Sequence, residues 1–85
     1  MTKQEVQDIV AKLCGALSDL GCIYEVTADN RSNRKSQYIY IRKPTYAEIR
    51  VSDHPPVAKR KKQFDVGPHG MTVEAVIDEL RARLR

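Results

Sequence analysis

Two tyrosines and two arginines stand at alternating positions of β-like segments, where they could bind nucleic acid. Tyr38, Tyr40 and Arg42 alternate with isoleucines, and Arg50 lies between an isoleucine and a valine. Because successive side chains of a strand point to opposite faces, these four would share the polar face of a sheet. Aromatic rings stack on bases, roughly 1–3 kcal/mol for each base, and guanidinium groups neutralise phosphates. The same residue types are also common on any solvent-facing antiparallel sheet, where cross-strand pairs stabilise the sheet.

Two basic segments could strengthen such a site. One is a run of four consecutive cations, and the other is a polar connection that contains an arginine and a lysine. The predicted nucleic-acid-binding residues outside the strands are Lys59, Arg60, Lys61, Lys62, Arg34 and Lys35. Four to six contacts with phosphates would give binding that weakens steeply as salt is added. A charge run this short is equally typical of a solvated loop.

Catalytic and metal chemistry have few candidate residues. Asp53, His54 and His69 are the only ones that resemble an active site, and no activated nucleophile accompanies them. Neighbouring residues of a strand point to opposite faces, so Asp53 would not orient His54. Their spacing, and that of the two cysteines, matches no metal-ligand pattern. The sequence therefore predicts no catalytic residue, no metal and no cofactor.

Length and composition restrict the class of protein. The 85 residues allow one domain, residues 1–85, with a radius of gyration of roughly 12 Å. The net charge is +4, and the surplus of Lys and Arg falls in the middle of the chain, which favours a polyanionic partner. Neither a membrane-spanning apolar run nor a charged-then-apolar leader is evident, so we expect a cytoplasmic protein without a membrane partner.

The apolar periodicity predicts the elements that must position these residues. Thr2 and Glu5 form a capping box before a helix over residues 3–20, and Gly21 supplies its end. Strands are predicted over residues 22–27, 37–43 and 48–52, and residues 63–66 are either a short fourth strand or a pinned segment. In the third of these, the polar face comprises Glu48, Arg50 and Ser52. Thr72 is the predicted cap of a second helix that begins at residue 73.

This order predicts an α+β fold, written α-β-β-β-(β)-α, whose antiparallel sheet carries both helices on one face. Sequential hairpins favour the spatial order 1-2-3 for the first three strands. The other face of the sheet would be left to solvent, because each of the two best strands has one apolar and one polar side.

The element order resembles that of double-stranded-RNA-binding domains and of the HicA-type mRNA interferase toxins that share their architecture. The HicA-type pattern has a catalytic histidine after Gly-Ser early in the second strand, where this chain has Lys35-Ser36-Gln37, so the catalytic histidine is absent. Double-stranded-RNA-binding domains carry lysines at the start of the last helix, whereas the cations here precede Thr72 by ten residues. The segments 36–41 and 49–54 are similar to short uncharacterised phage and prophage proteins, which implies a phage origin and no known activity.

Three functional hypotheses follow. The leading one is a small non-enzymatic nucleic-acid-binding accessory protein, with RNA or DNA as its partner, that uses the Tyr/Arg face and the basic loop. The alternative is a protein-interaction module that forms a homodimer or docks a partner through the same face or through an open sheet edge. The third is a small ribonuclease that uses His54 or His69.

Overall fold

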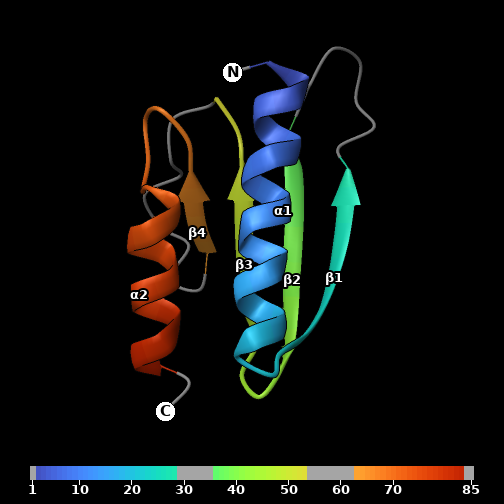
Figure 1. Cartoon of the computed structure of the whole chain (residues 1–85), viewed down its shortest axis with the longest axis vertical. Helices are drawn as coiled ribbons and strands as arrows, with labels where there is room; N and C mark the ends of the chain where they lie inside the picture. Colours follow the sequence, from blue (N-terminus) through green and yellow to red (C-terminus); the bar gives the residue numbers. More distant parts are fainter. Residues whose placement is uncertain (1, 29–35, 54–62, 84–85) are drawn as a thin grey trace.

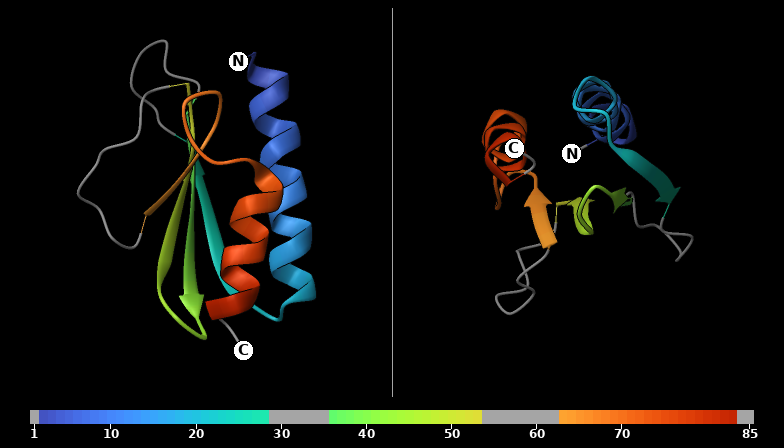
Figure 2. Two further views of the ribbon diagram at one scale, coloured as in Figure 1. Left: turned by 90° about the vertical axis from the view of Figure 1, so that its left-hand side faces the viewer. Right: turned by 90° about the horizontal axis from the view of Figure 1, so that it is seen from below.

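Two helices and four strands build the part of the chain that the structure describes. The structure is a computed structural model, and it describes residues 2–28, 36–53 and 63–83. The elements are α1 (Lys3–Asp19), β1 (Ile23–Ala28), β2 (Gln37–Lys43), β3 (Ala47–Val51), β4 (Gln63–Val66) and α2 (Val73–Arg83). The strands form one sheet in the order β1-β2-β3-β4, and both helices lie on the same side of it (Figures 1 and 2). The predicted α+β class, the order of the first three strands and the short fourth strand are confirmed.

The direction of β4 differs from the prediction of a wholly antiparallel sheet. β1, β2 and β3 pair antiparallel, as expected, but β4 runs parallel to β3. The parallel register sets Ile49 opposite Phe64 and Val51 opposite Val66, so the apolar residues of both strands face the helices. Alternation of apolar and polar residues has no direction, and either orientation of β4 would have satisfied it. The sequence pattern therefore could not distinguish the two.

The first helix follows its local sequence signals. The Thr2 hydroxyl accepts a hydrogen bond from the Glu5 amide at 3.1 Å, and the Glu5 carboxylate accepts one from the Thr2 amide at 3.1 Å. This is the predicted capping box. The helix ends at Asp19, and Gly21 adopts a φ of 74°, the left-handed conformation that glycine takes without strain. The buried stripe of α1 comprises Val6, Val10, Leu13 and Leu17.

The core lies between the two helices and one face of the sheet. Ile39, Ile41, Ile49 and Val51, from the two central strands, are completely buried there. Each such side chain contributes roughly 1.5–3 kcal/mol when removed from water. The radius of gyration is 12.0 Å, as predicted for a compact chain of this length. Neither described helix is both long and apolar enough to cross a membrane.

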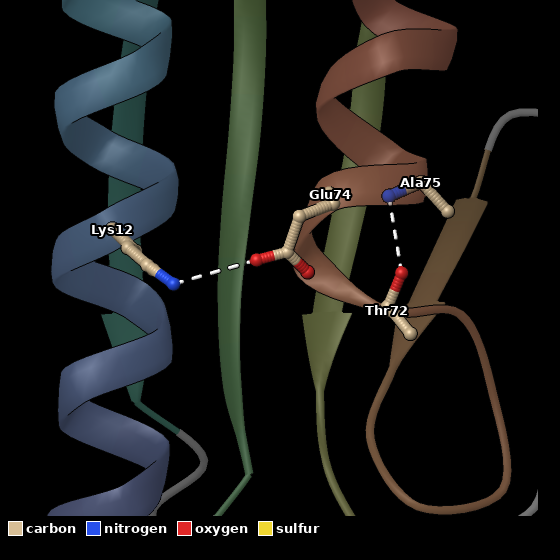
Figure 3. Close-up of polar contacts among 4 residues, drawn as sticks. All are labelled: Lys12, Thr72, Glu74 and Ala75. Carbon is tan, nitrogen blue, oxygen red and sulfur yellow. Dashed lines mark hydrogen bonds and ion pairs between the residues drawn. The ribbon is translucent and has the colours of Figure 1, made fainter.

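The second helix is fixed at its N-terminus and joined there to α1. The Thr72 hydroxyl accepts a hydrogen bond from the Ala75 amide at 3.1 Å, which confirms the predicted cap. Glu74, in the first turn of α2, forms an exposed ion pair with Lys12 of α1 at 3.4 Å (Figure 3). The two helices lie side by side over one face of the sheet, and no helix of the described residues covers the other face (Figure 2).

Candidate nucleic-acid interface

Tyr38 and Tyr40 lie together on the sheet face that the helices do not cover. They alternate along β2 with Ile39 and Ile41, which are buried on the helix side. The two rings are nearly parallel, with an interplanar angle of 11° and 6.2 Å between their centroids. Both side chains are half-buried. As predicted, both rings lie on the face of the sheet opposite the helices.

Arg42 continues this row but is paired with a carboxylate. One of its guanidinium nitrogens, Nη2, lies 3.0 Å from Oε2 of Glu25 on the neighbouring strand β1. Both side chains are exposed. An ion pair in such surroundings is worth roughly 0.2–1 kcal/mol, so a phosphate could compete for the arginine at little cost.

Arg50 is held much more firmly. Its Nε donates a hydrogen bond of 2.7 Å to Oδ1 of Asp65, the residue opposite it on β4, and the two side chains are only 12% and 13% exposed. A charge-assisted bond with this little exposure fixes the arginine in the sheet. Arg50 therefore joins β3 to β4, and its charge is already neutralised by a carboxylate.

The charges of the described sheet face do not add up to a cationic surface. Its acidic residues outnumber its basic ones, since Arg42 and Arg50 share the face with Glu25, Glu48 and Asp65. The sequence analysis missed this because cross-strand partners depend on the register, which connecting segments set. The described face is thus an aromatic surface with paired charges around it.

Ser52 was predicted on the polar face of its strand, but it lies one residue beyond β3 and is buried. β3 ends at Val51, and the Ser52 amide donates a hydrogen bond of 3.0 Å to the carbonyl of Val66 on β4. Its hydroxyl accepts a hydrogen bond of 2.8 Å from the Ser36 hydroxyl, and both side chains are buried. This bond joins the residue before β2 to the residue after β3.

The Ser36–Ser52 contact brings together the points where two basic segments leave the described fold. Arg34 and Lys35 immediately precede Ser36, and the run Lys59, Arg60, Lys61, Lys62 follows Asp53 by a few residues. These six predicted site residues lie outside the described residues. The described part of the chain holds seven of the 15 Lys and Arg but ten of the 11 Asp and Glu, a net charge of −3. The whole cationic surplus therefore belongs to the undescribed residues.

A third tyrosine, which the sequence analysis did not select, lies near the pair. Tyr46 precedes β3 and donates a hydrogen bond to the carboxylate of Glu48, the residue opposite Tyr40. This hydrogen bond raises the pKa of Tyr46, as do partial burial and the charge of Glu48. Arg42 lowers that pKa, and Tyr40 raises it. Tyr46 is 40% exposed. Its position in a polar turn gave no alternation signal that could have identified it.

The candidates for catalysis lie after the ends of strands or outside the described residues. His69 is exposed in the turn between β4 and α2, Asp53 is exposed after β3, and His54 lies outside the described residues. Across residues 2–28, 36–53 and 63–83, no group of three or more His, Cys, Asp or Glu side chains could hold a metal ion. The two cysteines, Cys14 and Cys22, are free and half-buried.

Comparisons with known proteins yield no significant match to a family model, a curated protein or a solved structure. The element order α-β-β-β-β-α matches the α+β arrangement of double-stranded-RNA-binding domains. In both, a helix comes first, a sheet follows and a second helix comes last. The likeness concerns the arrangement of elements, and function must be argued from the residues themselves.

Proposed function

We propose that this chain is a nucleic-acid-binding accessory protein, and that bases stack on Tyr38 and Tyr40. The observation that carries the proposal is the nearly parallel ring pair, 6.2 Å between centroids, on a sheet face without a helical cover. A base that is already stacked within a duplex cannot offer its face to a side chain, so the preferred ligand is single-stranded RNA or DNA. Tyr46, whose hydroxyl bonds to Glu48 opposite Tyr40, adds a third ring near the β2–β3 turn.

Phosphate contacts are assigned to the basic segments. The described residues carry a net charge of −3, so we assign the attraction for a polyanion to cations outside them, chiefly Arg34, Lys35 and the run Lys59–Lys62. Support for this assignment comes from the Ser36–Ser52 hydrogen bond, because it joins the ends of both segments to the fold beside each other. Tyr38 follows Lys35 by only three residues.

The proposal is tested by titrating labelled single-stranded RNA and DNA, and the matching duplexes, with the protein at about 50 and 200 mM salt. We expect micromolar binding to single strands at the lower salt. The Tyr38→Leu and Tyr40→Leu variants should each bind about 5- to 150-fold more weakly, the equivalent of roughly 1–3 kcal/mol for one stacked base.

Matched variants separate stacking from other effects of the substitutions. Tyr38→Phe and Tyr40→Phe keep the rings and should retain most of the binding. Lys12→Gln removes a cation from α1, on the opposite side of the sheet, and should change the affinity little. Absence of binding to every oligonucleotide at the lower salt would end the proposal, and equal losses with Phe and Leu would exclude stacking.

A further inference from the structure

The sheet has two edge strands, and the described residues protect only one of them. β4 is four residues long, and α2 packs against it. After β4 the chain turns back, so that the Met71 amide donates to the carbonyl of Asp65 at 2.7 Å and Met71 bridges to Val66. At the other edge, no described segment lies beyond β1 (Figures 1 and 2). Among the described residues, no strand pairs with the outer backbone N–H and C=O groups of β1.

The side chains of β1 do little to prevent such pairing. Monomeric proteins commonly protect an edge with lysine, proline or charges that point inward. β1 contains neither lysine nor proline, and its one charge, Glu25, points to the outer face and is paired with Arg42. On the helix side, Val26 pairs with the buried Ile39 but is itself 43% exposed. The bulge between Ile23 and Tyr24 lies at the start of the strand, so the residues from Tyr24 onward stay regular.

The sequence of β1 is complementary to itself in one antiparallel register. A two-fold axis at Val26 sets Val26 of one copy opposite Val26 of the second, and Glu25 of each copy opposite Thr27 of the other. The exposed valines then cover each other, and a carboxylate meets a hydroxyl. An axis at Glu25 would instead set two carboxylates opposite each other, which is unfavourable. Charge and apolar exposure thus favour a second copy, with Val26 at its centre.

We propose that the chain forms a homodimer in which β1 pairs antiparallel with β1 of a second copy, giving a continuous eight-stranded sheet. The proposal does not depend on nucleic-acid binding, because it uses the edge and leaves the outer face free. Its geometry has a consequence for that face. β2 and its symmetry mate would lie three strand spacings apart, about 14 Å, so that two Tyr38–Tyr40 pairs would share one surface.

The oligomeric state of the full chain tests the dimer. By sedimentation equilibrium we expect a dimer that Val26→Lys converts to a monomer, raising the dissociation constant at least about tenfold. Tyr46→Lys is the matched control, since it adds the same charge at a residue of similar exposure, 40%, away from β1, and should remain dimeric. A wild-type monomer at a chain concentration on the order of 100 μM would overturn the proposal. So would a dimer that Val26→Lys leaves unchanged.

Disulfide trapping tests the register and does not depend on whether the lysine variant folds. In a Cys14→Ala/Cys22→Ala background, Val26→Cys sets two thiols directly opposite each other, where Cβ atoms are about 4.5–5.5 Å apart. Under mild oxidation this variant should form covalent dimers at least about tenfold faster than Glu25→Cys, whose thiols would be diagonal neighbours. Equal rates, or faster trapping at position 25, would contradict the register.

Discussion

Nε of Arg50 donates a hydrogen bond to Oδ1 of Asp65 at 2.7 Å, directly across the parallel pair of β3 and β4. A short parallel strand at the edge of a sheet has few backbone bonds of its own, and parallel pairing is slightly weaker per residue than antiparallel pairing. Because the two side chains are 12% and 13% exposed, water competes weakly for either charge. The pair thus helps to hold β4, and with it the turn that leads into α2.

Removing one member of this pair should destabilise the protein. We expect Arg50→Gln and Asp65→Asn each to lower the free energy of unfolding by about 1–3 kcal/mol, because the remaining charge loses its partner in a largely buried position. A double-mutant cycle by urea unfolding should give a coupling of about 0.5–3 kcal/mol. The exposed Arg42–Glu25 pair is the control, with an expected coupling below about 1 kcal/mol. Equal couplings for the two pairs would contradict this account.

Two glycines should respond to alanine in opposite directions. Gly15 lies on the exposed side of α1, and nothing lies within 4 Å of an added Cβ, so Gly15→Ala should stabilise the protein by about 1 kcal/mol. At Gly70 an added Cβ would lie 2.4 Å from the carbonyl oxygen of Asp65, and Gly70→Ala should destabilise it because the turn must shift. Thermal unfolding of the two variants beside the wild type measures both effects. A melting temperature raised by Gly70→Ala would refute the close approach.

Local signals in the sequence predicted most of the fold. The capping box of Thr2 and Glu5, the turn at Gly21 and the cap at Thr72 each depend on residues within a few positions of one another, so the spacing alone revealed them. The alternation in residues 37–43 likewise identified both faces of β2. What could not be predicted depends on contacts between distant segments. The parallel direction of β4 is such a case.

In the candidate site, too, local features could be predicted and contacts between distant segments could not. Tyr38 and Tyr40 share the outer face because strand geometry requires it, and no other strand had to be known. Their surroundings could not be predicted, because the carboxylate partner of Arg50 comes from β4, fifteen residues later in the chain. Ser52 was predicted as an outward-facing strand residue, whereas it lies one residue beyond β3 and is buried, with its hydroxyl bonded to that of Ser36.

Acid should weaken the first helix through Glu5. The hydrogen bonds from the Thr2 amide and hydroxyl lower the pKa of the Glu5 carboxyl below its ordinary value. A carboxylate whose pKa is lower in the folded state stabilises the fold above its unfolded pKa, about 4.3 for Glu, and loses this effect as the pH falls through the folded value. Glu5→Gln should therefore show a shallower loss of stability below about pH 5 than the wild type. Urea midpoints between neutral pH and about pH 3 measure this, and Thr2→Val, which removes the hydroxyl but keeps the amide, should reduce the difference only in part.

The buried hydroxyl pair should behave as a unit. Ser36→Ala or Ser52→Ala alone leaves one buried hydroxyl without this partner, at a cost of about 1–3 kcal/mol in the free energy of unfolding. In the double variant the second substitution should cost less than it does alone, because the hydroxyls satisfy each other. Urea unfolding of the three variants tests this, with Ser18→Ala as an exposed control. Strict additivity would show that the bond contributes nothing.

The salt dependence of binding should separate the two parts of the proposed interface. Each cation that neutralises a phosphate releases counterions. The plot of log affinity against log salt therefore becomes steeper by about 0.7 for every contact with a single strand. Replacing Lys59, Lys61 and Lys62 by glutamine should reduce the slope by up to about 2, whereas Tyr38→Leu and Tyr40→Leu should lower the affinity and leave the slope unchanged. Arg42→Gln should change the slope by less than one contact, because Glu25 already pairs with that arginine. If the tyrosine variants alone altered the slope, the rings would be positioning phosphates, and the division between stacking and charge would have to be abandoned.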